Sequence, residues 1–304
     1  MPIIPVAADP VREEVAKRER QKQRALEKLE SLARKGIALK RHVFFVPGWA
    51  GEHGKAWTGY DGKLLKGHAS VKSWVEKIVR NPERVTYVNY LEFSDKESSV
   101  SKSFLDFGEL LKAKVRGKAT EALPIDLIGH SMGGLDILAA ITQGKDALTN
   151  VENCVAVASP LRGIVYSQFV KFADDLLPGM KWEPYHYVQV RNLATTCAAI
   201  RLVNLPENRR KLLERVKAFY HLEGTQDPTI MRSARLRTDG IPEQFKAKVQ
   251  GLPVEGASHS GAAGITHNPQ TVLHLISIIA DIPIEKPSGN KGYVYVRKGG
   301  QGQE

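Results

Sequence analysis

One serine lies between two glycines at the point where an apolar segment of the sequence becomes an amphipathic one. The segment 123–140 reads LPIDLIGHSMGGLDILAA, and its residues Gly129, Ser131 and Gly133 form the pattern G-x-S-x-G. In a tight turn from a strand into a helix, this pattern lifts the serine hydroxyl above the edge of a sheet. The glycines leave room for the neighbouring strand and helix, and the first helical amides favour negative charge beside the serine. The spacing therefore predicts a nucleophilic Ser131, with Gly129 and Gly133 as elbow glycines.

The alternative is a glycine-rich turn with a passive serine. A chain of this length contains G-x-S-x-G by chance roughly one time in ten. The context argues against chance, because an apolar run precedes the motif and an amphipathic helical pattern follows it. We therefore favour the nucleophile.

A serine nucleophile at neutral pH needs a general base, and the base needs a carboxylate that orients it. After a nucleophile elbow, the acid and then the histidine follow later in the chain. Asp227 in FYHLEGTQDP and His259 in GLPVEGASHSG come in that order, each on a loop after an apolar run. We predict that these two complete the site. Glu223 and the aspartates at 174–175 are the other candidates for the acid, and Asp227 could instead only form a turn.

Two further histidines lie near these motifs in the sequence. His267 in ITHNPQ is an alternative base, and if His259 is the base, His267 helps to begin the last helix. His130 precedes the serine directly, but turn geometry usually points such a side chain away from the hydroxyl. The choice between His259 and His267 stays open in the sequence.

The apolar runs and helical patterns of the whole chain place these residues on a sheet. Short runs rich in Val, Ile, Phe and Tyr predict strands, and apolar residues three and four apart predict helices. The predicted strands lie at 41–51, 84–93, 123–129, 150–160, 215–224 and 246–256, and the helices at 9–35, 103–117, 133–144 and 268–281. Apolar strands that alternate with helices are typical of a parallel sheet covered on both faces. The expected fold class is therefore α/β with a mostly parallel, doubly wound sheet.

Other segments lie outside this alternation. Asp9, Pro10 and Gly36 fit the beginning and end of an extra, charged N-terminal helix. Its narrow apolar stripe favours packing along the domain over contact with a partner or a membrane surface. The expected parts are the charged helix, the α/β domain with a helical lid or cap insertion, and a flexible tail, at 1–39, 40–285 (insertion 161–214) and 286–304.

Three motifs together resemble the α/β-hydrolase fold, and within it the lipase and esterase branch. GHSMGGLD is similar to the nucleophile elbow of many bacterial lipases and esterases. VASPLRG (157–163) resembles the TPHRG segment of those lipases, with Leu161 in place of the histidine. FVPGWAG (45–51) resembles the oxyanion loop, with Pro47 in place of the usual histidine. The resemblance covers roughly residues 40–282.

The resemblance implies a role for each candidate. Ser131 attacks an acyl carbonyl, His259 takes its proton and passes it to the leaving alcohol, and Asp227 holds the imidazole. The backbone N–H groups of Trp49 and Met132 form the oxyanion hole. The implied activity is hydrolysis of carboxylic esters through an acyl-enzyme, with thioester cleavage and acyl transfer open to the same residues. The competing hypothesis is a non-catalytic hydrolase-like scaffold, or a module that binds anionic surfaces through the basic N-terminal helix.

Composition restricts the class of protein. The chain has 304 residues, of which 42% are hydrophobic and 25% charged, as in ordinary globular proteins. Its formal net charge of +11 is spread along the chain, which favours a solvated basic surface over nucleic-acid binding. Cys154 and Cys197 are too few for a disulfide framework and lack metal-ligand spacing. We expect no metal, no cofactor and no nucleic-acid partner.

The N-terminal residues lack the basic and apolar regions of a signal peptide, and no apolar run is long enough to span a bilayer. These patterns predict a cytoplasmic protein. Its expected partner is a small-molecule or lipid ester. Transient contact with a membrane surface and the oligomeric state stay open.

Overall fold

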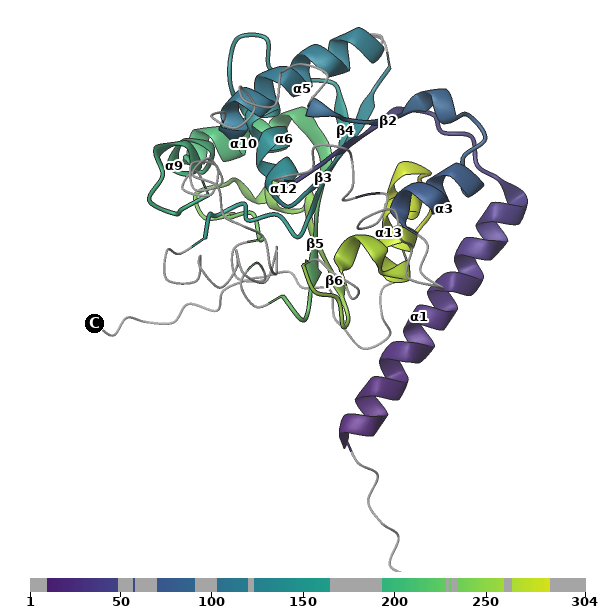
Figure 1. Ribbon diagram of the computed structural model, residues 1–304. Helices are drawn as coiled ribbons and strands as arrows, with labels where there is room; N and C mark the ends of the chain where they lie inside the picture. Colours follow the sequence, from purple (N-terminus) through teal and green to yellow (C-terminus); the bar gives the residue numbers. More distant parts are fainter. Residues whose placement is uncertain are drawn as a thin grey trace, which may run out of the picture.

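A single parallel sheet forms the centre of the molecule. The computed structural model describes residues 10–48, 57, 70–90, 103–119, 123–164, 193–227, 230, 234–259 and 264–284. Six strands lie in the order β2-β1-β3-β4-β5-β6, and every neighbouring pair is parallel. Helices cover both faces of this sheet (Figure 1). The predicted mostly parallel, doubly wound α/β sheet is confirmed.

The strands are short, apolar and most deeply buried at the centre of the sheet. They are β1 (His42–Val46), β2 (Val85–Tyr87), β3 (Ile125–His130), β4 (Val151–Val157), β5 (Val216–Gly224) and β6 (Val249–Val254). Every residue of β1 and β3 is buried, because helices cover both faces of the central strands. β2 and β6 form the two edges and are less buried. The parallel arrangement brings the carboxyl ends of all six strands to one edge.

Two groups of helices cover the sheet. The helices are α1 (Pro10–Lys35), α3 (Val71–Ile78), α5 (Phe104–Lys118), α6 (Met132–Thr142), α9 (Ala198–Val203), α10 (Pro206–Arg215), α12 (Glu243–Lys246) and α13 (Pro269–Ile279), with 3-10 turns η2 (Pro82–Arg84) and η4 (Ile265–His267). On one face α6 packs against β3, α5 and α10, and on the other face α13 packs against α1 and α3. Figure 1 shows these two layers on opposite sides of the strands.

Helix α6 follows the elbow and is buried on all sides. Its sequence, MGGLDILAAIT, is buried at every position because the sheet, α5 and α10 surround it. Close approach to α5 needs a small residue, since a Cβ added to Gly108 would lie 2.7 Å from the Cβ of Ala139. Tight packing around α6 holds the turn that begins it.

Several boundaries differ from the sequence prediction. Helix α3 was not predicted; it is short, and Ser70 caps it by accepting a hydrogen bond from the N–H of Ser73. Within the predicted strand 84–93, β2 spans only three residues, and residues 91–93 lie outside the described ones. Strand β6 begins three residues later than predicted, because α12 and a short turn come first.

The predicted cap and tail fall largely outside the described residues. The structure describes residues 193–214 of the insertion 161–214 and its first four residues, and none of the tail 286–304. Helix α10, at the end of that insertion, packs against α6 and β5. The extent of a cap stays a prediction. None of the helices in the described part of the chain combines the length and apolar character that crossing a bilayer requires.

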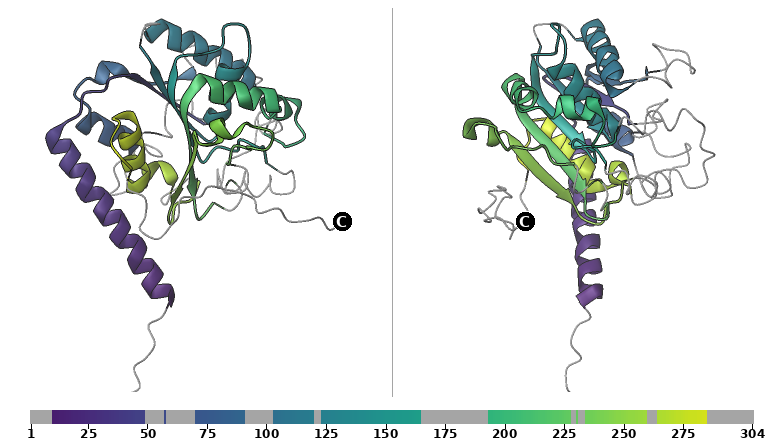
Figure 2. Two further views of the ribbon diagram at one scale, coloured as in Figure 1. Left: turned by 180° about the vertical axis from the view of Figure 1, so that it is seen from behind. Right: turned by 90° about the vertical axis from the view of Figure 1, so that its left-hand side faces the viewer.

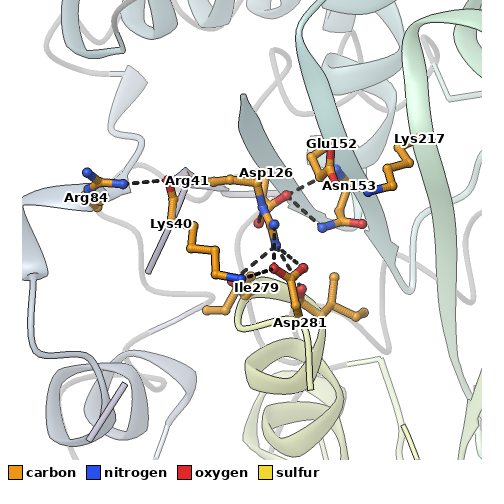
Figure 3. A network of polar contacts seen from close by, with 10 residues as sticks. Lys40, Arg41, Arg84, Asp126, Glu152, Asn153, Lys217, Ile279 and Asp281 are labelled. Carbon is orange, nitrogen blue, oxygen red and sulfur yellow. Dashed lines mark hydrogen bonds and ion pairs between the residues drawn. The ribbon is translucent and has the colours of Figure 1, made fainter. Parts of the chain in front are cut away.

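A buried ion pair joins the amino edge of the sheet to the end of α13 (Figure 3). The Nε of Arg41 donates to Oδ2 of Asp126 at 2.9 Å, and both side chains are almost fully buried. The other two guanidinium nitrogens of Arg41 donate to the two carboxylate oxygens of Asp281, at 2.9 and 2.8 Å. Asp126 also accepts two hydrogen bonds from Asn153 on β4. One side chain thus ties β1, β3 and α13 together at the edge away from the elbow.

Replacing Arg41 by methionine should lower the free energy of unfolding by about 3–5 kcal/mol, because it leaves the Asp126 carboxylate buried without its cation. Urea denaturation measures this loss. The matched control is Lys40→Met, because Lys40 is 79% exposed and lies 3.6 Å from Asp281. An exposed pair of this kind contributes little. Equal losses of unfolding free energy in the two variants would show that the buried pair of Arg41 and Asp126 does not stabilise the fold.

Candidate active site

Ser131 occupies a strained turn between β3 and α6. Its backbone has φ 52° and ψ −124°, a conformation that residues with a side chain rarely adopt. The N–H of Ser131 donates to the carbonyl of Val157 at 2.9 Å, and the carbonyl of Ser131 accepts from Gly134 at 3.2 Å. These bonds hold the turn between the end of β4 and the first turn of α6. The strain is of the kind that a surrounding structure imposes on a nucleophile elbow.

The two elbow glycines have no room for a side chain. A Cβ added to Gly129 would lie 2.5 Å from the backbone of Gly133, and one added to Gly133 would lie 2.4 Å from the carbonyl oxygen of Pro47. The loop after β1 approaches just as closely, because a Cβ on Gly48 would lie 2.7 Å from the Cβ of Ser131. Glycine at these positions lets the loop after β1 lie directly against the serine.

The structure brings Ser131, His259 and Asp227 together in one chain of hydrogen bonds. His259 Nε2 lies 3.1 Å from Ser131 Oγ, and His259 Nδ1 lies 2.9 Å from Asp227 Oδ2. Asp227 and His259 follow β5 and β6, so all three residues lie at the carboxyl edge of the sheet. All three are buried, with exposed fractions of 3%, 8% and 6% for the serine, the histidine and the aspartate.

Close packing of two loops sets the distance between Asp227 and His259. A Cβ added to Gly224, at the end of β5, would lie 2.3 Å from the carbonyl oxygen of Ala257. The N–H of Gln226 donates to that same carbonyl at 2.9 Å. The other oxygen of the Asp227 carboxylate accepts from the N–H of Ile230 at 3.1 Å, which orients the group. With its proton on Nδ1, His259 can donate a hydrogen bond to Asp227, which leaves Nε2 as an acceptor for the serine hydroxyl.

One alternative acid, Glu223, and the alternative base, His267, make other contacts in the structure. Glu223 pairs with Arg235, whose Nε lies 2.9 Å from its carboxylate. The aspartates at 174–175 lie outside the described residues. His267 belongs to η4, and its Nδ1 lies 3.3 Å from the hydroxyl of Thr266. The next residue, Asn268, caps α13 through its side chain. The histidine that forms a hydrogen bond with the hydroxyl of Ser131 is His259.

The ring of His130 packs beside the ring of His259, a contact that the sequence analysis did not predict. The two rings lie 5.2 Å apart between centroids, and the ring of Trp57 lies 6.0 Å from His130 at an angle of 73°. Among the described residues, neither ring nitrogen of His130 has a hydrogen-bond partner. Burial, followed by the nearby His259, depresses the pKa of His130 well below its usual range, so the ring is neutral. Its place directly before the serine was the available signal.

One of the two predicted oxyanion donors is described. Met132 is the first residue of α6, so its N–H is among the first four of the helix, which have no acceptor within the helix. Trp49 lies outside the described residues, whereas Pro47 and Gly48 before it lie against the elbow. Within the ranges that the structure describes, no three His, Cys, Asp or Glu side chains gather to hold a metal ion.

A second buried carboxyl lies one turn into α6. The hydroxyl of Tyr90 donates to Oδ2 of Asp136 at 3.0 Å, and Oδ1 of Asp136 has no partner among the described residues. Burial raises the pKa of Asp136 well above its usual range, although the bond from Tyr90 opposes this. The folded protein therefore holds a proton on Asp136 that the unfolded chain releases above about pH 4.

Replacing Asp136 by asparagine should stabilise the protein at neutral and alkaline pH. The folded-state pKa lies above the unfolded one, so the wild type loses stability as the pH rises between the two, by about 1.4 kcal/mol per pH unit. The amide has no proton to lose and keeps the shape of the neutral acid. Urea denaturation of both proteins from pH 4 to pH 9 should show a difference that grows with pH. A constant difference would contradict the buried neutral carboxyl.

Solved structures align with this chain, although no protein-family model matches its sequence. The search of curated proteins found no match. Phospholipase PlaB from Legionella pneumophila aligns with a TM-score of 0.52 and 14% identity, over 80% of this chain and 60% of that one. This chain therefore spans less than two thirds of the phospholipase.

Two shorter proteins align over a larger share of their own length. A serine hydrolase involved in carbazole degradation, the CarC enzyme, aligns over 82% of this chain and 92% of its own, with a TM-score of 0.44 and 14% identity. A membrane phospholipase A, described as a bacterial virulence factor, aligns over 82% of this chain and 80% of its own, with a TM-score of 0.45 and 13% identity. Together with the six parallel strands and the elbow after β3, the likeness to the Legionella structure shows that this chain has the α/β-hydrolase fold.

Proposed function

We propose that this chain is a serine hydrolase that cleaves carboxylic esters through an acyl-enzyme intermediate. The observation that supports this most is the unbroken path of hydrogen bonds from Asp227 through His259 to Ser131 Oγ. A neutral histidine between a carboxylate and a serine is the arrangement that makes a serine hydroxyl nucleophilic. The strained backbone of Ser131 supports the same role, because strain of this kind is found at functional sites.

The proposed reaction has two halves. In the first, Ser131 Oγ attacks the ester carbonyl carbon while His259 Nε2 takes the hydroxyl proton. The C–O bond to the alcohol then breaks, and His259 returns the proton to the leaving alcohol oxygen. In the second, His259 takes a proton from water, the hydroxide attacks the acyl-enzyme carbonyl, and Ser131 leaves with the proton restored. Asp227 keeps the imidazole oriented and stabilises the imidazolium in both halves.

The proposed oxyanion hole lies where the loop after β1 meets the elbow. The first N–H of α6, at Met132, and that of Trp49 would donate to the negative oxygen of the tetrahedral intermediate. The positive end of the α6 dipole adds to this stabilisation. Removing one such donor typically costs about two to three powers of ten in kcat.

The proposed substrates are small-molecule esters or lipid esters. The phospholipase of the same fold acts on a lipid by its name, which supports this class without defining the acyl length. Thioester cleavage and acyl transfer to an acceptor other than water would use the same three side chains.

The test measures turnover of p-nitrophenyl esters over a series of acyl lengths, together with labelling by a p-nitrophenyl dialkyl phosphate. We expect ester turnover, with a chain-length optimum that separates esterase from lipase activity. The phosphate should transfer its dialkylphosphoryl group to one serine, found by mass spectrometry on the peptide that contains Ser131. Absence of both turnover and labelling would overturn the proposal and favour the non-catalytic scaffold.

A further inference from the structure

Helix α1 extends past the edge of the sheet at which the triad geometry lies. Its C-terminal end leads to β1 at the amino edge, and its N-terminal end projects beyond the strands (Figures 1 and 2). Arg18 lies level with the end of β6, because a Cβ added to Gly256 would be 3.5 Å from its Cδ. Gly256 belongs to the loop that carries His259. At 1.5 Å per residue, Val11 lies roughly 10 Å beyond this level.

Two valines are exposed at the projecting end of α1. They lie on the helix face that packs against the domain further along the helix. Val11, Val15, Arg18, Lys22, Ala25 and Leu29 follow one another at spacings of four and three, which is one stripe of a helix. Ala25 and Leu29 are buried where the stripe meets the domain. Val11 and Val15 are 69% and 53% exposed, and exceed the other exposed large apolar side chains among the described residues, Leu123 and Leu205, both at 38%.

Basic side chains outnumber acidic ones on the projecting end, three to two over residues 10–18, and they are also in excess over the whole helix. Helix α1 carries nine Lys and Arg residues and five Glu residues, which gives a net charge of +4. Glu14 is paired with Lys17 and Arg18, and Glu19 with Lys22. Arg12 and Lys17 are exposed on the projecting end, and they lie on either side of the valine stripe. Apolar side chains flanked by exposed Lys and Arg are typical of helices that lie in the interface of an anionic bilayer.

We infer that the projecting end of α1 docks on an anionic lipid surface, with Val11 and Val15 inserted and Arg12 and Lys17 at the phosphate groups. The contact lies at the carboxyl edge of the sheet, so it would hold Ser131, Asp227 and His259 facing the same surface. This docking rests on the proposed function, because holding the three side chains at a lipid surface matters only for an enzyme that cleaves esters. Lipid binding itself requires no catalysis, so the two can be tested separately.

The experiment uses the full chain with Ser131→Ala, so that vesicles are bound and not consumed. Sedimentation with vesicles of phosphatidylcholine, with and without phosphatidylglycerol, measures the partition coefficient at low and high salt. We expect binding to the anionic vesicles that weakens with salt. Val11→Asp with Val15→Asp should lower the partition coefficient more than tenfold. Arg12→Gln with Lys17→Gln should lower it about thirtyfold.

The matched control removes the same charge from the opposite edge of the sheet. Lys40→Gln with Lys217→Gln changes two exposed lysines at the amino edge and should change binding by less than about twofold. Equal losses in the control and the α1 variants would overturn the docking surface, as would absence of binding to anionic vesicles. A change in the sedimentation coefficient of the valine variants in solution would assign the valines to a second copy instead. Vesicle binding without any ester turnover would overturn the proposed function and leave the docking surface standing.

Discussion

Replacing Ser131 by alanine is expected to lower kcat for p-nitrophenyl esters by about a millionfold, the scale seen when a serine nucleophile is removed. The substitution removes only the hydroxyl group, which the proposed mechanism needs to form the acyl-enzyme. The residual rate comes from binding and from the oxyanion donors, which the variant keeps. Initial rates with the most reactive ester of the series measure the loss, and phosphoryl labelling of the Ser131 peptide should disappear with it.

The control for this variant is another buried serine that plays no part in the site. Ser277 lies in α13 with 5% of its surface exposed, so Ser277→Ala makes the same change in a comparable environment. Its kcat should stay close to that of the wild type. A Ser131→Ala protein that folds and retains more than about a hundredth of the wild-type kcat would refute Ser131 as the nucleophile.

Replacing His259 by alanine should lower kcat by a similar factor, whereas His267→Ala should change it by less than about tenfold. The distances favour this outcome, because His259 contacts both Ser131 and Asp227, whereas His267 lies at the end of the 3-10 turn η4. The comparison decides between the two bases that the sequence left open. Kinetics of both variants on one ester, with urea denaturation as the test of folding, measure it.

The reverse order of effects would assign the base to His267. The hydrogen bonds around His259 would then be structural. Because a unit of three residues loses most of its activity when either the serine or the histidine is removed, the double variant of Ser131 and His259 should be no slower than the single ones. Additive losses would show that the two side chains act separately.

Local patterns were enough to predict the sheet and the elbow. The run 123–130 is apolar and the glycines after it are close together, so a strand, a tight turn and a helix follow from neighbouring residues alone. Helix α3 was missed because it spans only eight residues and its identity depends on packing against α1 and α13. Helix α10 lies at the end of the segment that the sequence predicted as a helical insertion, and its contacts with α6 and β5 could not be predicted from neighbouring residues.

The amino-acid sequence by itself determined the fold class and the order in which Ser131, Asp227 and His259 occur, because strand, helix and turn preferences act over a few residues. Only the tertiary structure decided which histidine meets the serine, since His259 and His267 are eight residues apart and both follow β6. It also placed neutral His130 beside His259 and left Val11 and Val15 beyond the domain. These features depend on distances between segments far apart in the chain, and such distances are set by the close packing of the whole core.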